Sequence, residues 1–300
     1  MSDPIRVFDP RAVRRHRARA MRVGPADFLQ VEAAARLADR LGDIHRAFPR
    51  ALDLGSGGGA LARGVAGRGG IEWLVAVDAA EACLRGCAAP RVAAEPEALP
   101  FAPQSFDLVL SNLVLHWTND LPGALVQLRQ MLKPDGLLLA TLWGGETLWE
   151  LRGALIDAEL AGEGGASPRV SPFADLRDLA GLLQRAGFAL PVADADTIEV
   201  TYPDALALMR ELRAMGESNA VLERRRGFTR RTTLARAAAI YAQRFGRVDG
   251  RIPATFQLCT LTAWAPHESQ PQPLRPGSAA ARLADALGSE EHSAGDRAQP

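Results

Sequence analysis

The sequence predicts an α/β protein in which helices cover both faces of a parallel sheet. Short apolar runs alternate with segments whose apolar residues recur every three or four positions, and this alternation is typical of strands separated by helices. The expected strands are 50–54, 72–78, 91–94, 105–112 and 136–143. Because parallel sheets bind ligands at the carboxyl ends of their strands, we expect a site just after positions 54, 78, 94 and 112.

Capping and turn residues justify the helices between these strands. Asp27 is a typical N-cap for the helix that precedes the first strand, and Pro134 and Gly136 end the helix before the fifth. The expected helices are 28–41, 60–67, 80–86 and 121–132. The second half is more helical, with helices expected at 175–188, 203–216 and 230–245, an extended segment at 188–201 and a final strand at 254–264.

Composition excludes several classes of protein. The 300 residues carry 35 basic and 35 acidic side chains, a balance that excludes recognition of a polyanion by bulk charge, so no nucleic-acid partner is expected. No apolar run approaches the roughly 18 residues of a membrane span, and the N-terminal segment lacks the apolar core of a secretory signal. Three cysteines cannot form a disulfide framework, so reduced thiols in the cytoplasm are expected.

The central motif is LDLGSGGGA at 52–60, a glycine-rich turn between the first strand and a helix. Gly55 permits a tight turn, Gly57 allows the close approach of a ligand, and Gly59 is expected to let the helix pack on the strand. Asp78 ends the next strand, where a carboxylate can accept hydrogen bonds from two ribose hydroxyls. An adenosine-bearing cofactor is therefore the expected ligand.

Asp53 distinguishes between two cofactors of this kind. Gly55, Gly57 and Ala60 also match the dinucleotide-binding pattern G-x-G-x-x-G/A. A carboxylate at position 53 would repel a pyrophosphate, whereas it would attract the cationic amino and sulfonium groups of S-adenosylmethionine (SAM). A solvated strand end or a helix cap is the structural alternative for Asp53. SAM is the cofactor that the motif favours.

Later segments add candidate contacts to the cofactor. Glu95 follows the third strand and can accept a hydrogen bond from an adenine amino group, with a surface carboxylate as the alternative. Ser111 and Asn112 stand at the carboxyl end of the fourth strand. The complete set of expected cofactor residues is Asp53, Gly55, Ser56, Gly57, Gly59, Asp78, Ala79, Glu95, Pro96, Ser111 and Asn112.

These motifs together resemble the class I SAM-dependent methyltransferases. The resemblance covers residues 48–143 and rests on D-x-G-x-G-x-G, the strand-end acid, the acid before LPF, FD-hydrophobic-V and LKPDG. It implies a Rossmann-like sheet of seven strands with helical insertions, and SAM over the first four strand ends. In this pattern Glu95 takes the place of a more usual Asp.

A narrower resemblance extends over most of residues 5–277. LHWTNDLPGAL, GGETLWELR, SPRVSPF, MGESN, PATFQ and HESQP are similar to motifs of the complex I assembly factor 5 family. That family is described as protein-arginine hydroxylases, so the resemblance implies a subunit of respiratory complex I (NADH dehydrogenase) as the protein substrate. The SAM region is also similar to malonyl-carrier-protein methyltransferases of biotin synthesis.

The resemblance divides the chain into four regions. We expect an N-terminal basic segment and cap helix at 1–47, a SAM-binding core at 48–145, a helical substrate-side region that completes the sheet at 146–264, and a disordered tail at 265–300. The basic segment is expected to fold over the cofactor or to contact a partner protein, with a solvated helix as the alternative. The expected location is the cytoplasm, with peripheral contact at the inner membrane.

Polar side chains outside the cofactor set are candidates for the reacting face. The catalytic candidates are His116, Glu146, Arg152, Glu217 and Asn219, with Trp117 and Trp149 beside them. His116 follows the fourth strand, where the transferred methyl group would point, and Glu146 could pair with a guanidinium. Roles in the site wall, in capping and in an ordinary turn are the alternatives. The five histidines do not form the pattern of an iron hydroxylase, so no metal site is expected.

Three functions remain open on these residues. The first is modification of an arginine of a complex I subunit. The second is O-methylation of a malonyl carrier protein or a small molecule, and the third is a SAM-binding assembly chaperone without catalysis. Methyl transfer to a positioned acceptor needs little acid–base help, so the lack of a catalytic triad does not separate the three.

Overall fold

The computed structural model describes residues 6–24, 26–88, 90–271, 278, 282–290 and 292. They belong to two units, Met1–Pro266 and His267–Pro300. The helices of the first unit are α1 (Pro10–Val23), α2 (Phe28–Gly42), α3 (Ala60–Gly64), α4 (Glu81–Leu84), α5 (Leu121–Met131), α6 (Trp149–Glu163), α7 (Leu176–Arg185), α8 (Ala205–Met215) and α9 (Arg231–Phe245). Its strands are β1 (Arg50–Leu54), β2 (Trp73–Asp78), β3 (Arg91–Ala93), β4 (Phe106–Asn112), β5 (Leu132–Trp143), β6 (Ala189–Tyr202) and β7 (Ile252–Trp264).

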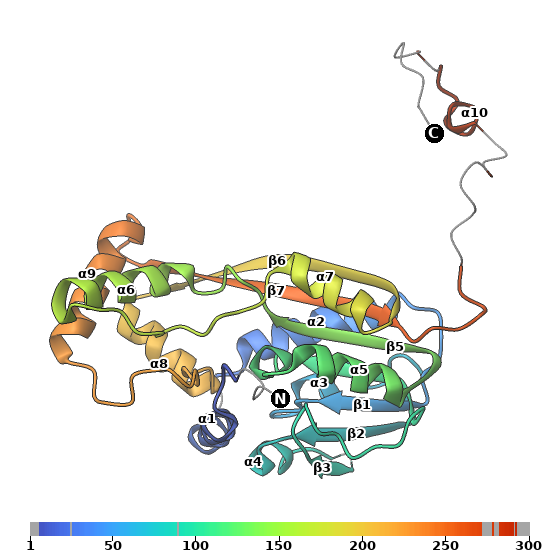
Figure 1. Cartoon of the computed structure of the whole chain (residues 1–300), viewed down its shortest axis with the longest axis horizontal. Helices are drawn as coiled ribbons and strands as arrows, with labels where there is room; N and C mark the ends of the chain where they lie inside the picture. Colours follow the sequence, from blue (N-terminus) through green and yellow to red (C-terminus); the bar gives the residue numbers. More distant parts are fainter. Residues whose placement is uncertain are drawn as a thin grey trace, which may run out of the picture. The chain divides into compact units, whose positions relative to one another are not determined.

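A seven-stranded sheet with the order β3-β2-β1-β4-β5-β7-β6 organises the first unit (Figure 1). Strands β1 to β5 pair in parallel, whereas β7 runs antiparallel to both of its neighbours. The strand order reverses at β1, which lies between β2 and β4, and ligands bind such sheets outside the strand ends at this point. The predicted Rossmann-like α/β fold with seven strands is confirmed.

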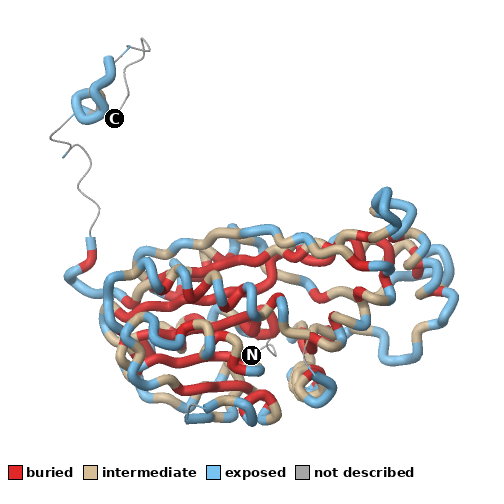
Figure 2. Tube along the Cα trace, turned by 180° about the vertical axis from the view of Figure 1, so that it is seen from behind, coloured by how far each residue is buried: buried red, intermediate tan, exposed pale blue. Residues whose placement is uncertain are grey.

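Apolar side chains of the strands alternate between the two faces of the sheet. Leu52 and Leu54 of β1 pack with α5 and α7 on one face, while Ala51 packs with α2 and α3 on the other. Figure 2 shows the inner strands of the sheet as largely buried traces, whereas the outer layer is more exposed. Because both faces are covered, the strands of the first half appear in the sequence as nearly continuous apolar runs.

A second group of helices, α6, α8 and α9, gathers at one end of the long β6–β7 pair (Figure 1). The hydroxyl of Tyr241 in α9 donates to the carbonyl oxygen of Pro253 at 2.7 Å. Its buried ring belongs to a cluster with Leu208 of α8, Leu155 of α6 and Phe256 of β7. No helix of the described residues is long and apolar enough to cross a membrane.

Helix α6 is not predicted from the sequence, because two buried acids interrupt its apolar face. Glu150 accepts hydrogen bonds from the N–H and hydroxyl groups of Thr255. Glu159 is 1% exposed and pairs with Arg169. Glu150 is satisfied by a residue of a distant strand, and Glu159 by the segment that follows the helix. The apolar periodicity of α6 is therefore interrupted in the sequence.

The N-terminal basic segment forms α1, which begins with a cap and a favourable first residue. The carboxylate of Asp9 accepts from the N–H of Ala12 at 3.1 Å, and Pro10 stands at the first helical position. In the second unit the described residues include α10 (Leu283–Leu287). Half of the positions in the tail predicted to be disordered, 265–300, lie outside the described residues, and its disorder stays a prediction.

Candidate functional site

The turn after β1 carries the glycine motif. The N–H groups of Gly55 and Ser56 donate to the carbonyl oxygen of Val77, at 2.7 and 3.0 Å. Gly55 has a φ of +79°, and a Cβ there would lie 2.4 Å from Cγ1 of Val114, so glycine is required. The close packing predicted for Gly59 is wrong, because a Cβ there would meet nothing closer than 3.4 Å. Its φ of +76° is the feature that favours glycine.

Asp53 is fully buried beneath this turn. Neither of its carboxylate oxygens has a hydrogen-bond partner among the described residues. Burial raises the pKa of Asp53 to about 7. The solvated strand end that was the alternative is therefore excluded, and a buried carboxylate without a partner is a group that a nearby cation would stabilise.

Asp78, at the end of β2, forms an ion pair and hydrogen bonds within the protein. Its Oδ2 atom lies 2.6 Å from Nη2 of Arg17 in α1, and the two side chains are 1% and 12% exposed. The N–H of Gly57 donates to Oδ2 at 3.1 Å, and that of Ala80 donates to Oδ1 at 2.9 Å. The carboxylate is thus held in a fixed orientation at the edge of the glycine turn.

Glu95, which follows β3, forms an ion pair with Arg14 of the same helix, α1. Its Oε1 atom lies 2.7 Å from Nη1 of Arg14, although both side chains are more than a third exposed. Burial raises the pKa of Glu95. Arg14 and Arg17 are three positions apart and so lie on one face of α1. That spacing is visible in the sequence, but nothing in the sequence says which acids the two arginines would meet.

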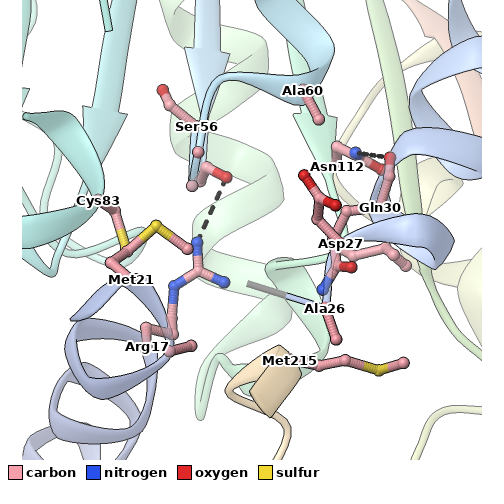
Figure 3. Close-up of a pocket in the computed structure, with 15 residues that line it drawn as sticks. Arg17, Met21, Ala26, Asp27, Gln30, Ser56, Ala60, Cys83, Asn112 and Met215 are labelled. Atoms are coloured by element: carbon pink, nitrogen blue, oxygen red, sulfur yellow. Dashed lines mark hydrogen bonds between the residues drawn. The ribbon is translucent and has the colours of Figure 1, made fainter. Parts of the chain in front are cut away.

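One cavity lies at the glycine turn and a second beside Asp78 and Glu95, and Arg17 lines both. Figure 3 shows the first cavity, into which Arg17 reaches from α1 toward the glycine turn. The second cavity lies beside Asp78. Of the expected cofactor residues, the first cavity is lined by Gly55, Ser56, Gly57 and Asn112, and the second by Asp78, Ala79, Glu95 and Pro96.

Asn112, at the end of β4, is hydrogen-bonded to other parts of the protein, and its neighbour Ser111 is fully buried. The amide of Asn112 donates to the carbonyl oxygen of Gln30 in α2 at 2.9 Å, and its Oδ1 accepts from the hydroxyl of Thr141 at 2.8 Å. Asn112 therefore joins α2 to the sheet and contributes the wall of the first cavity. Ser111 is fully buried and lines neither cavity.

His116 and Glu217, two separate predictions, come together in the structure. Nε2 of His116 lies 3.2 Å from Oε2 of Glu217, and the side chains are 1% and 9% exposed. The rings of Trp117, Trp143 and Phe173 surround the imidazole, with centroids 5.1, 6.4 and 5.9 Å away. This arrangement places one carboxylate and one imidazole inside an aromatic wall.

A third cavity opens beside Glu217. Its aromatic lining consists of Trp117, Trp143, Phe173 and Phe256. Two arginines also line it: Arg169 is held by the buried carboxylate of Glu159, whereas Arg213 is exposed. The cavity therefore combines an apolar body with few charged groups, as is usual for sites that bind part of a substrate.

The remaining catalytic candidates are scattered. Asn219 lines the third cavity, but its amide holds the chain by donating to the carbonyl oxygen of Pro168 at 2.7 Å. Arg152 lines a neighbouring cavity and donates to backbone carbonyls. Glu146 and Trp149 are exposed and line no cavity described here. Within the described part of the chain, no three His, Cys, Asp or Glu side chains gather as ligands for a metal ion.

The chain is similar to known proteins along most of its length. It is 46% identical over 264 residues to "Arginine-hydroxylase NDUFAF5, mitochondrial" of Danio rerio, which covers 86% of this chain and 82% of that protein. It is 40% identical over 266 residues to "Malonyl-[acyl-carrier protein] O-methyltransferase" of Halorhodospira halophila, covering 86% and 88%. A crystal structure assigned as a methyltransferase of Bacillus halodurans shares the fold, with a TM-score of 0.55, 17% identity and coverage of 79% and 100%.

A sequence profile described as a methyltransferase domain matches residues 52–140. With the sheet and the glycine turn, these matches define the class: the protein is a SAM-dependent enzyme of the class I methyltransferase superfamily. Within that class, the chain belongs to the family of the NDUFAF5 arginine hydroxylases. The resemblance that the sequence motifs indicate, and SAM as the cofactor, are confirmed.

Proposed function

We propose that SAM lies across the first two cavities, with Asp78 facing its ribose and Glu95 its adenine. The remaining contacts fall to Gly55, Ser56, Gly57, Gly59, Ala79, Pro96 and Asn112, and Asp53 acts from beneath the turn. Ser111 is buried and lines neither cavity, so it receives no contact to SAM in this proposal. A cation would stabilise the buried, unpaired carboxylate of Asp53, and the Gly55 turn brings backbone close to a ligand. When bound, SAM supplies a sulfonium whose methyl group is activated for transfer.

We propose further that the enzyme modifies an arginine side chain of a respiratory complex I subunit. The observation that carries this proposal is the carboxylate of Glu217 inside the aromatic wall of the third cavity. A guanidinium pairs with a carboxylate and stacks on aromatic rings, so this cavity suits an arginine. The name of the Danio rerio relative supports the same residue type. The location expected for this activity is the cytoplasm, with peripheral contact at the inner membrane.

Mass spectrometry of complex I subunits tests the proposal. We expect a deletion strain to lack a modified arginine that the parent strain carries, and the mass of the lost group separates an added oxygen from an added methyl. Glu217→Gln should leave the arginine unmodified because the neutral amide no longer pairs with it. Glu223→Gln is the matched control, since Glu223 is exposed and does not line the third cavity. An arginine that stays modified in the deletion strain contradicts the proposal.

The same strains separate an enzyme from a chaperone without catalysis. Asp53→Ala removes the carboxylate beneath the turn and is expected to abolish SAM binding. If complex I still assembles while the arginine is unmodified, assembly does not need the cofactor. If assembly fails together with modification, both depend on bound SAM.

One observation favours a second candidate, O-methylation of a malonyl carrier protein. Arg213 lines the third cavity, is exposed and forms no ion pair in the described part of the chain, so it could receive a malonyl carboxylate. The 40% identity to the Halorhodospira halophila enzyme supports the same candidate. A deletion strain that needs biotin, and that grows without it when given the parent gene but not when given Arg213→Gln, would favour this function. A deletion strain that grows without biotin would rule it out.

A further inference from the structure

We propose that Arg17 selects the cofactor by its α-carboxylate: the guanidinium pairs with Asp78 in the ligand-free chain and with the carboxylate when the cofactor is bound. The inference rests on the proposed cofactor site and is independent of the arginine-modifying activity. Its consequence is that ligands without an amino-acid end bind poorly, even when they carry the same adenosine.

The position of Arg17 is the first observation. Arg17 is the residue that the two cavities share, since it lines both the one at the glycine turn and the one beside Asp78. Its Nη2 atom lies 2.6 Å from Oδ2 of Asp78 and 3.4 Å from the carbonyl oxygen of Gly55. A ligand that extends from one cavity to the other needs the space that this guanidinium occupies, so the pair with Asp78 must open.

The unused hydrogen-bonding capacity of Arg17 is the second observation. Its Nε atom is buried and has no hydrogen-bond partner among the described residues. Nε and one terminal nitrogen form the edge of a guanidinium that receives a carboxylate through two parallel hydrogen bonds. A carboxylate on this edge would satisfy a buried donor that the ligand-free chain leaves unpaired.

The charges of the first cavity are the third observation. Arg17 is the cationic side chain among the residues described as lining it, and Asp27 is the acidic one. Asp53 lies buried beneath the same turn. An amino-acid end carries one ammonium and one carboxylate, so this cavity offers a partner of opposite sign to each.

Helix α1 itself is anchored, which confines the change to the side chain. The N–H of Asp9 donates to the carbonyl oxygen of Ala220 at 2.8 Å, and Nδ1 of His16 lies 3.0 Å from the carbonyl oxygen of Ser218. Asp78 keeps its two backbone donors when Arg17 leaves. Ribose hydroxyls can then replace the arginine on Asp78, so neither charge is left buried without a partner.

Calorimetry with two probes tests the exchange on the full chain. S-adenosylhomocysteine carries the α-carboxylate, whereas 5′-methylthioadenosine lacks the whole amino-acid end. In Arg17→Gln we expect methylthioadenosine to bind more tightly, because no guanidinium competes for Asp78, and adenosylhomocysteine to bind less tightly. We define the ratio as the dissociation constant of methylthioadenosine divided by that of adenosylhomocysteine. This ratio should fall by about tenfold or more in Arg17→Gln, which is the size of a lost charge-assisted hydrogen bond.

Two further variants make the result decisive. Arg15→Gln, on the exposed side of α1, should leave the ratio unchanged. Arg17→Lys keeps the charge without the planar fork and should give an intermediate ratio, and it serves if Arg17→Gln does not fold. If the ratio for Arg17→Gln equals that of the parent chain, the proposal is overturned. Both ligands would then bind more tightly if Arg17 only blocks the site, or less tightly if Arg17 only supports the fold. If the parent chain does not bind adenosylhomocysteine at all, the proposed cofactor site itself is contradicted.

Discussion

Oε2 of Glu217 lies 3.2 Å from Nε2 of His116, although 101 positions separate the two residues in the sequence. His116 belongs to the turn that follows β4, and Glu217 follows the end of α8. The contact therefore joins the end of β4 to the end of α8, and it does so at the wall of the third cavity.

A double-mutant cycle should show that this pair is coupled. We expect His116→Ala and Glu217→Ala to be non-additive in urea unfolding, with an interaction energy of roughly 1–3 kcal/mol, because both side chains are nearly buried. Arg14→Ala with Glu95→Ala is the control cycle, and that more exposed pair should give about 1 kcal/mol or less. Additive losses at His116 and Glu217 would contradict the coupling.

Asp53 should make the ligand-free chain less stable as pH rises. Its pKa is about 7 in the folded chain and near 3.8 when unfolded, so between these values the folded state binds more protons and the free energy of unfolding falls with pH. Asp53→Asn removes this dependence. We expect the variant to be more stable than the parent by on the order of a few kcal/mol at pH 8 and to approach the parent near pH 4. Urea titrations across this range measure it, and parallel pH curves would refute it.

Gly55→Ala should destabilise the protein through the turn. The new Cβ would meet Val114 at 2.4 Å on a backbone with a φ of +79°, so we expect a loss of roughly 2–5 kcal/mol from overpacking and backbone strain together. Gly153→Ala is the control, because Gly153 lies inside α6 with open space around it. It should raise the melting temperature slightly. Equal effects at the two positions would argue against the steric account.

Two of the cysteines should resist alkylation in the folded chain. Burial raises the pKa of Cys83 to about 12 and that of Cys259 to about 11, so at pH 8 only roughly one Cys83 thiol in ten thousand is a thiolate. We expect iodoacetamide to modify Cys87, which is half-buried, faster than either. Mass spectrometry of timed samples measures the rates, with urea-unfolded protein as the reference. Rapid labelling of Cys259 in the native chain would contradict its burial.

The first half of the fold follows from the sequence because its determinants are local. β1, β2, β4 and the later part of β5 are apolar runs, and parallel pairing follows from the helices between strands. The second half depends on distant partners. Glu150 and Glu159 conceal α6 until their partners on β7 and in the 167–173 segment are known. The place of β7 between β5 and β6 is likewise a matter of long-range pairing.

The candidate site divides in the same way. The glycine turn, Asp53 and Asp78 are readable because a short motif specifies a backbone shape and a charge at fixed spacing. The arginines of α1 are not, since Arg17 meets Asp78 across 61 positions. His116 and Glu217 can each be nominated from the sequence, but their contact cannot. Pairings between separate elements carry no periodic signal, so the structure is needed to find them.

The inner position of β7 sets when the protein can finish folding during synthesis. β7 ends at Trp264 and fills the gap between β5 and β6, with which it forms ladders along most of its length. A nascent chain that has emerged only through α9 therefore exposes two unpaired strand edges at once. Such edges recruit other chains, so ribosomes that stall before position 252 should release products that aggregate rather than a smaller working enzyme.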